Sequence, residues 1–296
     1  RDVMTYQRDT LVSGLELSRQ NALIAPGPGS NALSFGAAEA QSALYGQYTH
    51  RFFNDASIYG GLRAEHDAPM GSIVDPTAGG TVALGALRVG VNAGESYRVP
   101  TIEDLYYPGS SNPLLQPERS RNADVTIRAP LILGGISFGW FGREATNLIM
   151  FDQNFVPQNA QRASTRGLML TAETQPSRGL RARIGITNLY RAVDLTPGMS
   201  HARLPFDPVF AVTFGLLHDL GTSHLAYGVG GHFEGPHAEE GPSYPGFMTF
   251  DAYARWRVDA HAIVTLRSRN VTNQRYEPIN GYPAPGRTLE IELSNR

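Results

Sequence analysis

Apolar and polar residues alternate along much of the chain with a period of two. In the segment 288–293, leucine or isoleucine occupies every second position, and threonine or glutamate occupies the others. The segments 250–258, 180–187, 136–141 and 123–128 show the same alternation. Since successive side chains of a β-strand point to opposite faces, this pattern predicts strands with one apolar and one polar face.

A weaker form of this alternation predicts further strands, which brings the total to about thirteen, each of roughly ten residues, with no convincing amphipathic helix. These further strands are expected over 11–19, 40–50, 56–65, 82–93, 166–174, 209–217, 224–233 and 262–270. Strands of soluble sandwiches usually have ~5–6 residues, whereas a tilted membrane-spanning strand needs ~9–11. Periodicity alone does not separate a membrane barrel from a soluble β-protein. The length of the predicted strands favours an all-β, transmembrane antiparallel barrel.

The polar faces of the predicted strands carry many charged residues. A soluble sheet could present them to water, but in a membrane barrel the apolar face meets lipid and the polar face lines a watery lumen. On the barrel interpretation, a set of arginines is expected to face the lumen, where it would attract anionic groups: Arg181, Arg183, Arg255, Arg257 and Arg267.

The connections between the predicted strands support the barrel. Short turns near 258–260, 218–222, 174–179 and 129–133 alternate with longer segments. Outer-membrane barrels show this alternation, with short periplasmic turns and long extracellular loops. Tyrosine and phenylalanine also gather near the strand ends, as in the aromatic girdles at membrane interfaces.

Composition excludes several classes of protein. With 18% charged and 41% hydrophobic residues, the 296-residue chain is not disordered, and it has no apolar run long enough for a helical membrane span. Cysteine is absent, which excludes disulfides and thiol catalysis. The net charge of -2 argues against a nucleic-acid partner, and all 25 basic residues are arginine.

Four sequence motifs lie between or within the predicted strands. Residues 97–106 read YRVPTIEDLY and residues 112–120 read NPLLQPERS, a strand exit followed by a loop that Pro113 and Pro117 restrict. Residues 159–173 contain Asn, Ala, Gly and Glu at wide spacing. Near the C-terminus, residues 269–276 read RNVTNQRY and residues 281–287 read GYPAPGR.

In this order, the motifs resemble those of TonB-dependent outer-membrane receptors, which are roughly F-R-x-P-T-x-x-E-L-Y followed by N-P-x-L-x-P-E-x-S, a loop-to-strand N…A…G…E stretch, N-L-x-D/N-x-x-Y and G-Y-x-x-P-G-R. Tyr97 stands where the pattern has phenylalanine, and Asp104 where it has glutamate. The resemblance assigns a structural role to the matched positions, which are Arg98, Pro100, Glu103, Leu105, Tyr106, Asn112, Pro113, Pro117, Glu118, Asn270, Tyr276, Gly281, Tyr282, Gly286 and Arg287.

The resemblance implies a barrel of 22 strands in the outer membrane of a Gram-negative bacterium, filled by an N-terminal plug. It further implies active transport of a scarce ligand, cobalamin or a ferric siderophore, with no cofactor. A TonB box before the plug would engage the TonB–ExbB–ExbD complex, and outer-membrane lipid would surround the barrel. Because about thirteen strands and no plug or TonB box are recognised, residues 1–296 are interpreted as the C-terminal portion of such a barrel.

One inconsistency concerns the strand count near residues 67–80. Counting strands back from the C-terminus places this segment on the periplasmic side, whereas the likeness of residues 60–63 to the family places a long extracellular loop directly after them. One strand is therefore missing from the pattern, either a short one over 70–74 or a whole hairpin arm.

No catalytic or metal site is predicted. Residues 94–98 contain Gly-x-Ser but lack the closing glycine of a nucleophile elbow. His232 and His237, with Glu234, Glu239 and Glu240, could bind a metal or a metal chelate, but a hydrophilic loop explains them more simply. Two alternatives remain: a passive porin-like channel or outer-membrane β-barrel enzyme, and a soluble β-rich binding protein.

Overall fold

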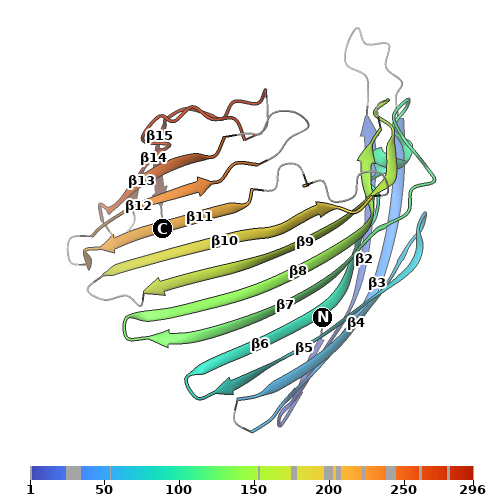
Figure 1. The fold of residues 1–296 in the computed structure, drawn as a ribbon, viewed down its shortest axis with the longest axis horizontal. Coiled ribbons are helices and arrows are strands. Elements are labelled where there is room, and N and C mark those ends of the chain that lie inside the picture. Colours follow the sequence, from blue (N-terminus) through green and yellow to red (C-terminus); the bar gives the residue numbers. More distant parts are fainter. Residues whose placement is uncertain are drawn as a thin grey trace. The chain divides into compact units, whose positions relative to one another are not determined.

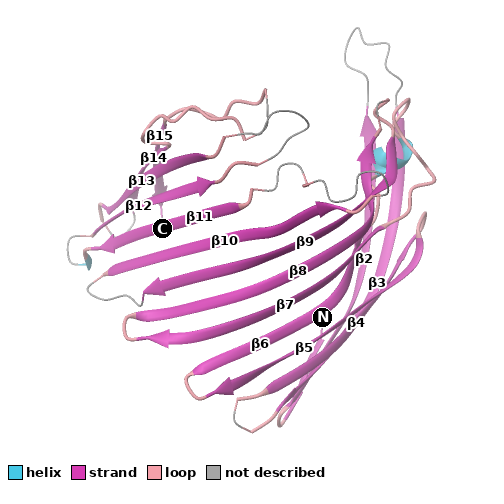
Figure 2. Ribbon diagram, in the orientation of Figure 1, coloured by secondary structure: helices cyan, strands magenta, loops and turns pink. Residues whose placement is uncertain are grey.

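The protein is built almost entirely of β-strands, as Figure 2 shows for the computed structural model. The structure describes residues 2–24, 35–53, 55–152, 154–174, 179–196, 203–204, 208–221, 224–237, 245–259, 262–278 and 281–295. The strands are β1 (Asp2–Tyr6), β2 (Asp9–Ile24), β3 (Phe35–Arg51), β4 (Ser57–Asp67), β5 (Gly71–Leu84), β6 (Leu87–Arg98), β7 (Glu118–Leu131), β8 (Gly134–Phe151), β9 (Pro157–Thr174), β10 (Leu180–Asp194), β11 (Phe210–Asp219), β12 (Leu225–Glu234), β13 (Phe247–Arg257), β14 (Ala262–Arg269) and β15 (Thr288–Asn295).

One short helix, α1 (Ile102–Tyr106), interrupts the connection between β6 and β7. Among the described residues, no helix has the length and apolar character needed to cross a membrane.

The strands pair in sequence order, from β1 to β15, within one sheet. Figure 1 shows this order as a continuous change of colour from blue to red across neighbouring strands. The pairs from β1 to β6 and from β10 to β15 are antiparallel. This confirms the prediction of an all-β, antiparallel architecture.

The structure contains two strands that the alternation of side chains did not predict, β1 and β5. The missing strand near 67–80 is β5, which pairs with β4 along its length. Its pattern is hidden because Pro76, Ala78 and Gly80 occupy successive positions of its apolar face, where other strands have large apolar side chains. The prediction of one strand over 82–93 is wrong, since Gly85, with φ of 61°, lies in the turn between β5 and β6.

The chain divides into two compact units. The first unit comprises residues 1–125, 141–165 and 193–202, and the second comprises residues 126–140, 166–192 and 203–296. Each unit is described by itself below.

In the second unit, strand register separates an apolar face from a polar one. Ile184 lies opposite Phe214, and Leu266 lies opposite Ile291, all on the apolar face. Apolar side chains on this face are well exposed, with Ile291 at 67%. Such exposure suits a surface that meets lipid rather than water.

The first unit shows the same division into faces. Leu44, Ala64 and Val74 are successive cross-strand neighbours on its apolar face, where Leu44 is 62% exposed. A small core lies where α1 packs on β3, and it includes Ile102 and Leu105.

Candidate functional site

The connection between β6 and β7, residues 99–117, is held in one conformation by a helix cap. The Thr101 hydroxyl accepts a hydrogen bond from the Asp104 amide at 3.1 Å, and the Asp104 carboxylate accepts one from the Thr101 amide at 2.9 Å. This reciprocal pair satisfies two donors at the start of α1. Pro100 and Leu105 are fully buried, so two side chains of the motif at 97–106 pack inside the protein and hold this connection in place.

Two asparagines join this connection to the start of β9. Asn112 Nδ2 donates to the Pro157 carbonyl at 3.0 Å. Asn159 Oδ1 accepts from the Gln116 amide at 2.6 Å, and Asn159 Nδ2 donates to the Gln116 and Asn147 carbonyls, each at 2.8 Å. The motif at 112–120 therefore lies beside the start of the motif at 159–173, because Asn159 bonds both the amide and the carbonyl of Gln116.

An ion pair joins the two ends of the same connection, the last residue of β6 and the first residue of β7. Arg98 donates to Glu118 through Nε at 2.9 Å and through Nη2 at 2.6 Å, and Glu118 Oε1 also accepts from the Ile149 amide at 2.9 Å. The Glu118 side chain is only 10% exposed. A two-point guanidinium contact is the strongest kind of ion pair, so it fixes where β6 ends and β7 begins.

The other motif positions in this connection have less contact with the protein. Glu103, Tyr106 and Pro113 are exposed, and Pro117 is half-buried. Sequence reasoning missed Leu115, which is 3% exposed and packs inside the segment. The sequence feature that could have indicated this buried residue is the apolar pair at 114–115, which lies between two prolines in a predicted loop.

A second structured connection, residues 270–287, precedes β15. Asn270 is buried with φ of 49°, and its side chain bonds the amide and the carbonyl of Gln274, each at 2.8 Å. Asn273 Oδ1 accepts from the Arg287 amide at 2.9 Å. A Cβ on Gly286 would lie 2.8 Å from that oxygen, which explains glycine there.

Aromatic contacts complete this second connection. Tyr276 stacks on Phe247 with ring centroids 4.1 Å apart. Gly281 has φ of 78°, a conformation that favours glycine. Tyr282 is 71% exposed. The structural role of the motif positions as a set stays a prediction, but Asn270 and Tyr276 have clear local partners.

The predicted arginines share the polar face of the second unit. Strand register places Arg183 in line with Gly215, Gly230 and Asp251, and Arg267 in line with Tyr253. The same period of two puts the other predicted arginines on this face: Arg181, Arg255 and Arg257. Whether the face lines a lumen stays a prediction.

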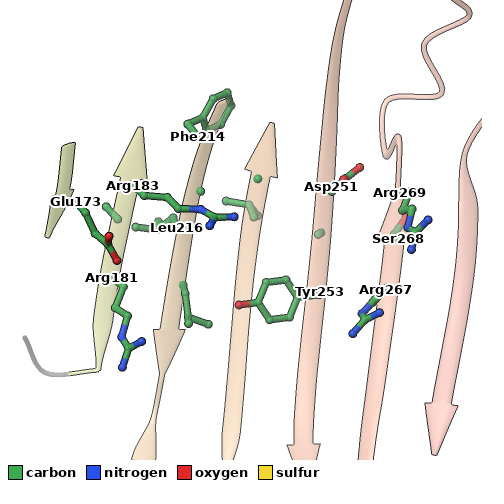
Figure 3. A pocket seen from close by; sticks show the side chains of 16 residues that line it. Glu173, Arg181, Arg183, Phe214, Leu216, Asp251, Tyr253, Arg267, Ser268 and Arg269 are labelled. Atoms are coloured by element: carbon green, nitrogen blue, oxygen red, sulfur yellow. The ribbon is translucent and has the colours of Figure 1, made fainter. Parts of the chain in front are cut away.

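A pocket of about 440 Å³ lies on this part of the sheet. Figure 3 shows the side chains that line it. Arg181, Arg183 and Arg267 line it, together with Arg269 and the carboxylates of Glu173 and Asp251. The Arg183 side chain lies over Gly215, where a Cβ would be 3.3 Å from Arg183 Nε. Guanidinium groups gathered in this way can bind carboxylate or phosphate groups.

One glycine of this face is covered by an aromatic ring. A Cβ on Gly228 would lie 2.6 Å from the Leu216 carbonyl oxygen and 2.7 Å from Cε1 of Tyr253. We expect Gly228→Ala to lower the free energy of unfolding by about 1–3 kcal/mol, since the strand backbone must move. The shift of the denaturation midpoint in detergent measures it.

Gly60, in β4, is the matched control, because a Cβ there meets no atom within 4 Å. Gly60→Ala should change the free energy of unfolding by less than about 0.5 kcal/mol. Equal losses in the two variants would contradict the packing argument.

The structure describes part of the histidine and glutamate cluster at 232–240. His232 Nε2 lies 3.3 Å from Glu234 Oε2, and His237 Nδ1 lies 3.8 Å from Glu234 Oε1. Glu239 and Glu240 lie outside the described residues. Within the described part of the chain, no group of three or more His, Asp or Glu side chains is arranged to hold a metal ion.

Curated relatives of this chain include two proteins named vitamin B12 transporter BtuB. That of Photobacterium profundum is 33% identical over 94 residues, 29% of this chain and 16% of the relative. That of Vibrio vulnificus is 25% identical over 169 residues, 55% of this chain and 27% of the relative. The matches therefore span well under a third of these relatives.

Solved structures share the fold at low sequence identity. The siderophore receptor PirA from Acinetobacter baumannii has a TM-score of 0.79 at 14% identity, with 99% of this chain and 53% of that chain covered. The ferric enterobactin receptor PfeA in complex with BCV-L6 has a TM-score of 0.75 at 15% identity, with 97% and 51% covered. This chain thus spans about half of each structure.

The family match extends over nearly the whole chain. Residues 4–273 match the family described as "TonB dependent receptor-like, beta-barrel". Members of this family are transporters and not enzymes, which agrees with the expectation from sequence. The antiparallel sheet and this match together show that the chain belongs to the TonB-dependent receptor β-barrel family.

Proposed function

We propose that the whole protein is an active-transport receptor, energised by the TonB–ExbB–ExbD complex, and that this chain is the C-terminal part of its barrel wall. As a TonB-dependent receptor barrel, the chain is located in the outer membrane of a Gram-negative bacterium. The observation that carries the proposal is the family match over residues 4–273. The coupling to TonB is inferred from the family.

The test of energy coupling compares uptake with and without TonB. Deleting TonB should abolish accumulation of the ligand by cells that express the full-length receptor. A passive channel, the alternative, would let the ligand equilibrate at the same rate in both strains. Uptake that does not depend on TonB would therefore contradict active transport.

For the ligand, we propose cobalamin or a ferric siderophore. The two named BtuB relatives transport vitamin B12 by their names, whereas PfeA and PirA are named as siderophore receptors. Growth with each ligand as the only source of cobalamin or of iron, with and without the gene, separates the two. The gene should be required for one ligand and not for the other.

We propose that the arginine-bearing face of the second unit faces the lumen and holds the plug by charged hydrogen bonds. Replacing Arg255, Arg257 and Arg267 together by Gln should weaken plug contact and lower the rate of uptake, because neutral amides make weaker bonds to carboxylates. Uptake of radiolabelled ligand measures the effect.

A second variant that also loses arginine charge serves as the control. Arg88 and Arg121 belong to exposed pairs with Asp55 and Glu95 in the first unit. Their replacement by Gln should leave uptake near the wild-type rate, since exposed pairs contribute little. Unchanged transport in the triple variant would refute the role of these arginines.

A further inference from the structure

Two carboxylates on the polar face of the first unit are buried beside each other. Asp67, the last residue of β4, is 1% exposed, and Glu39, on β3, is 5% exposed. Gln41 lies directly opposite Asp67 across the two strands. Glu39 is two residues from Gln41 on the same strand and therefore lies diagonally across from Asp67 on the same face.

The hydrogen bonds around this pair leave one oxygen on each residue without a donor. Ser18 Oγ donates to Gln41 Oε1 at 3.2 Å, and Gln41 Nε2 donates to Asp67 Oδ2 at 2.9 Å. Asp67 Oδ1 and Glu39 Oε1 are buried, and no described residue donates to either oxygen. Buried polar atoms in native proteins nearly always have a partner, so these two oxygens require an explanation.

Other buried carboxylates of the same unit have donors. Glu118, whose side chain is 10% exposed, lies 2.6 Å from Arg98. Asp194, 6% exposed, accepts from Gln161 Nε2 at 2.9 Å and from the Thr196 amide at 2.7 Å. Glu39 and Asp67 differ from these, because each keeps one buried oxygen to which no described residue donates.

We propose that Glu39 Oε1 and Asp67 Oδ1 together bind one hard divalent cation of the Ca²⁺ class. Two adjacent ionised carboxylates are strongly unfavourable in a buried position, and a divalent ion neutralises both. The donors are carboxylate oxygens, which Ca²⁺ prefers, and no thiol or imidazole belongs to the pair. Water and main-chain oxygens would supply the remaining ligands.

Such an ion would have a structural role. It would join β3 to β4, and β3 is the strand on which α1 packs. In Figure 2, α1 lies beside β3, and α1 is itself part of the connection that carries the motif at 97–106. The ion would therefore stabilise the strands that support this connection.

The test uses the full-length receptor, folded in detergent and treated with a chelator, and titrates it with Ca²⁺ in a calorimeter. Glu39→Gln and Asp67→Asn should each weaken one Ca²⁺ site about tenfold or more, because each removes a charged ligand. Glu16→Gln is the control, since Glu16 is exposed and pairs with Arg63. It should leave the affinity unchanged.

Thermal unfolding separates loss of the ion from loss of the fold. In metal-free buffer, Glu39→Gln and Asp67→Asn should melt no lower than the wild type, because each relieves repulsion between the carboxylates. Added Ca²⁺ should raise the Tm of the wild type and of Glu16→Gln but not of the other two. Equal Ca²⁺ binding by all four proteins, or no binding by the wild type, would overturn the proposal, and the second result would leave a proton as the compensating charge.

Discussion

Replacing Arg98 by alanine is expected to lower the free energy of unfolding by about 3 kcal/mol, roughly a hundredfold change in the folding equilibrium. Among the described residues, the variant leaves the buried Glu118 carboxylate with the Ile149 amide as its one remaining donor. Breaking a buried pair costs about 3–5 kcal/mol, and the half-exposed Arg98 head group places this pair at the lower end. Denaturant titration of the full-length receptor in detergent measures the change.

Two further variants show whether burial is the cause. Arg121 also contacts a carboxylate, Glu95 at 2.9 Å, but its side chain is 80% exposed. Arg121→Ala should therefore cost less than about 1 kcal/mol. Combining Arg98→Met with Glu118→Gln should recover much of the lost stability, because no unpaired charge remains buried. Equal losses for Arg98→Ala and Arg121→Ala would contradict this explanation.

Replacing Asn270 by alanine is expected to lower the free energy of unfolding by about 3 kcal/mol. Two side-chain bonds to the Gln274 backbone are lost, each contributing about 1 kcal/mol. Alanine must also adopt the left-handed conformation of Asn270, which costs about 1 kcal/mol more. The shift of the denaturation midpoint in detergent again provides the measurement.

Asn270→Gly isolates the hydrogen bonds from the backbone conformation. Glycine tolerates φ of 49° without strain, so this variant should lose about 2 kcal/mol and remain more stable than Asn270→Ala. A glycine variant as unstable as the alanine variant would show that the left-handed backbone adds nothing. Wild-type stability in both would contradict the importance of this cap.

Much of the sheet could be predicted from the alternation of side chains. Residues 248–257 of β13 and 288–294 of β15 alternate, because one face meets lipid and the other is polar. The pattern failed at β5, where small residues and Pro76 take positions that elsewhere carry large apolar side chains. It also failed at β1, whose five residues are too few to show a period.

The contacts of the candidate site were less predictable than its residues. The motif positions came from a resemblance, which names residues but not their partners. Asn112 reaches Pro157, and Gln116 reaches Asn159, across 45 and 43 positions of the chain. No local pattern encodes such pairs, since they depend on how neighbouring hairpins are placed. The buried pair of Glu39 and Asp67 likewise depends on the register between β3 and β4.

The length of the strands has a consequence for what the cell presents to its surroundings. Strands β8 and β9 each contain 18 residues. At ~3.4 Å per residue and a tilt of ~45°, such a strand rises by roughly 43 Å, whereas the apolar band of an outer-membrane barrel is only ~25 Å tall. Part of each strand must therefore extend beyond the apolar band as ordered sheet. Antibodies and bacteriophages would therefore meet ordered sheet before they meet the membrane.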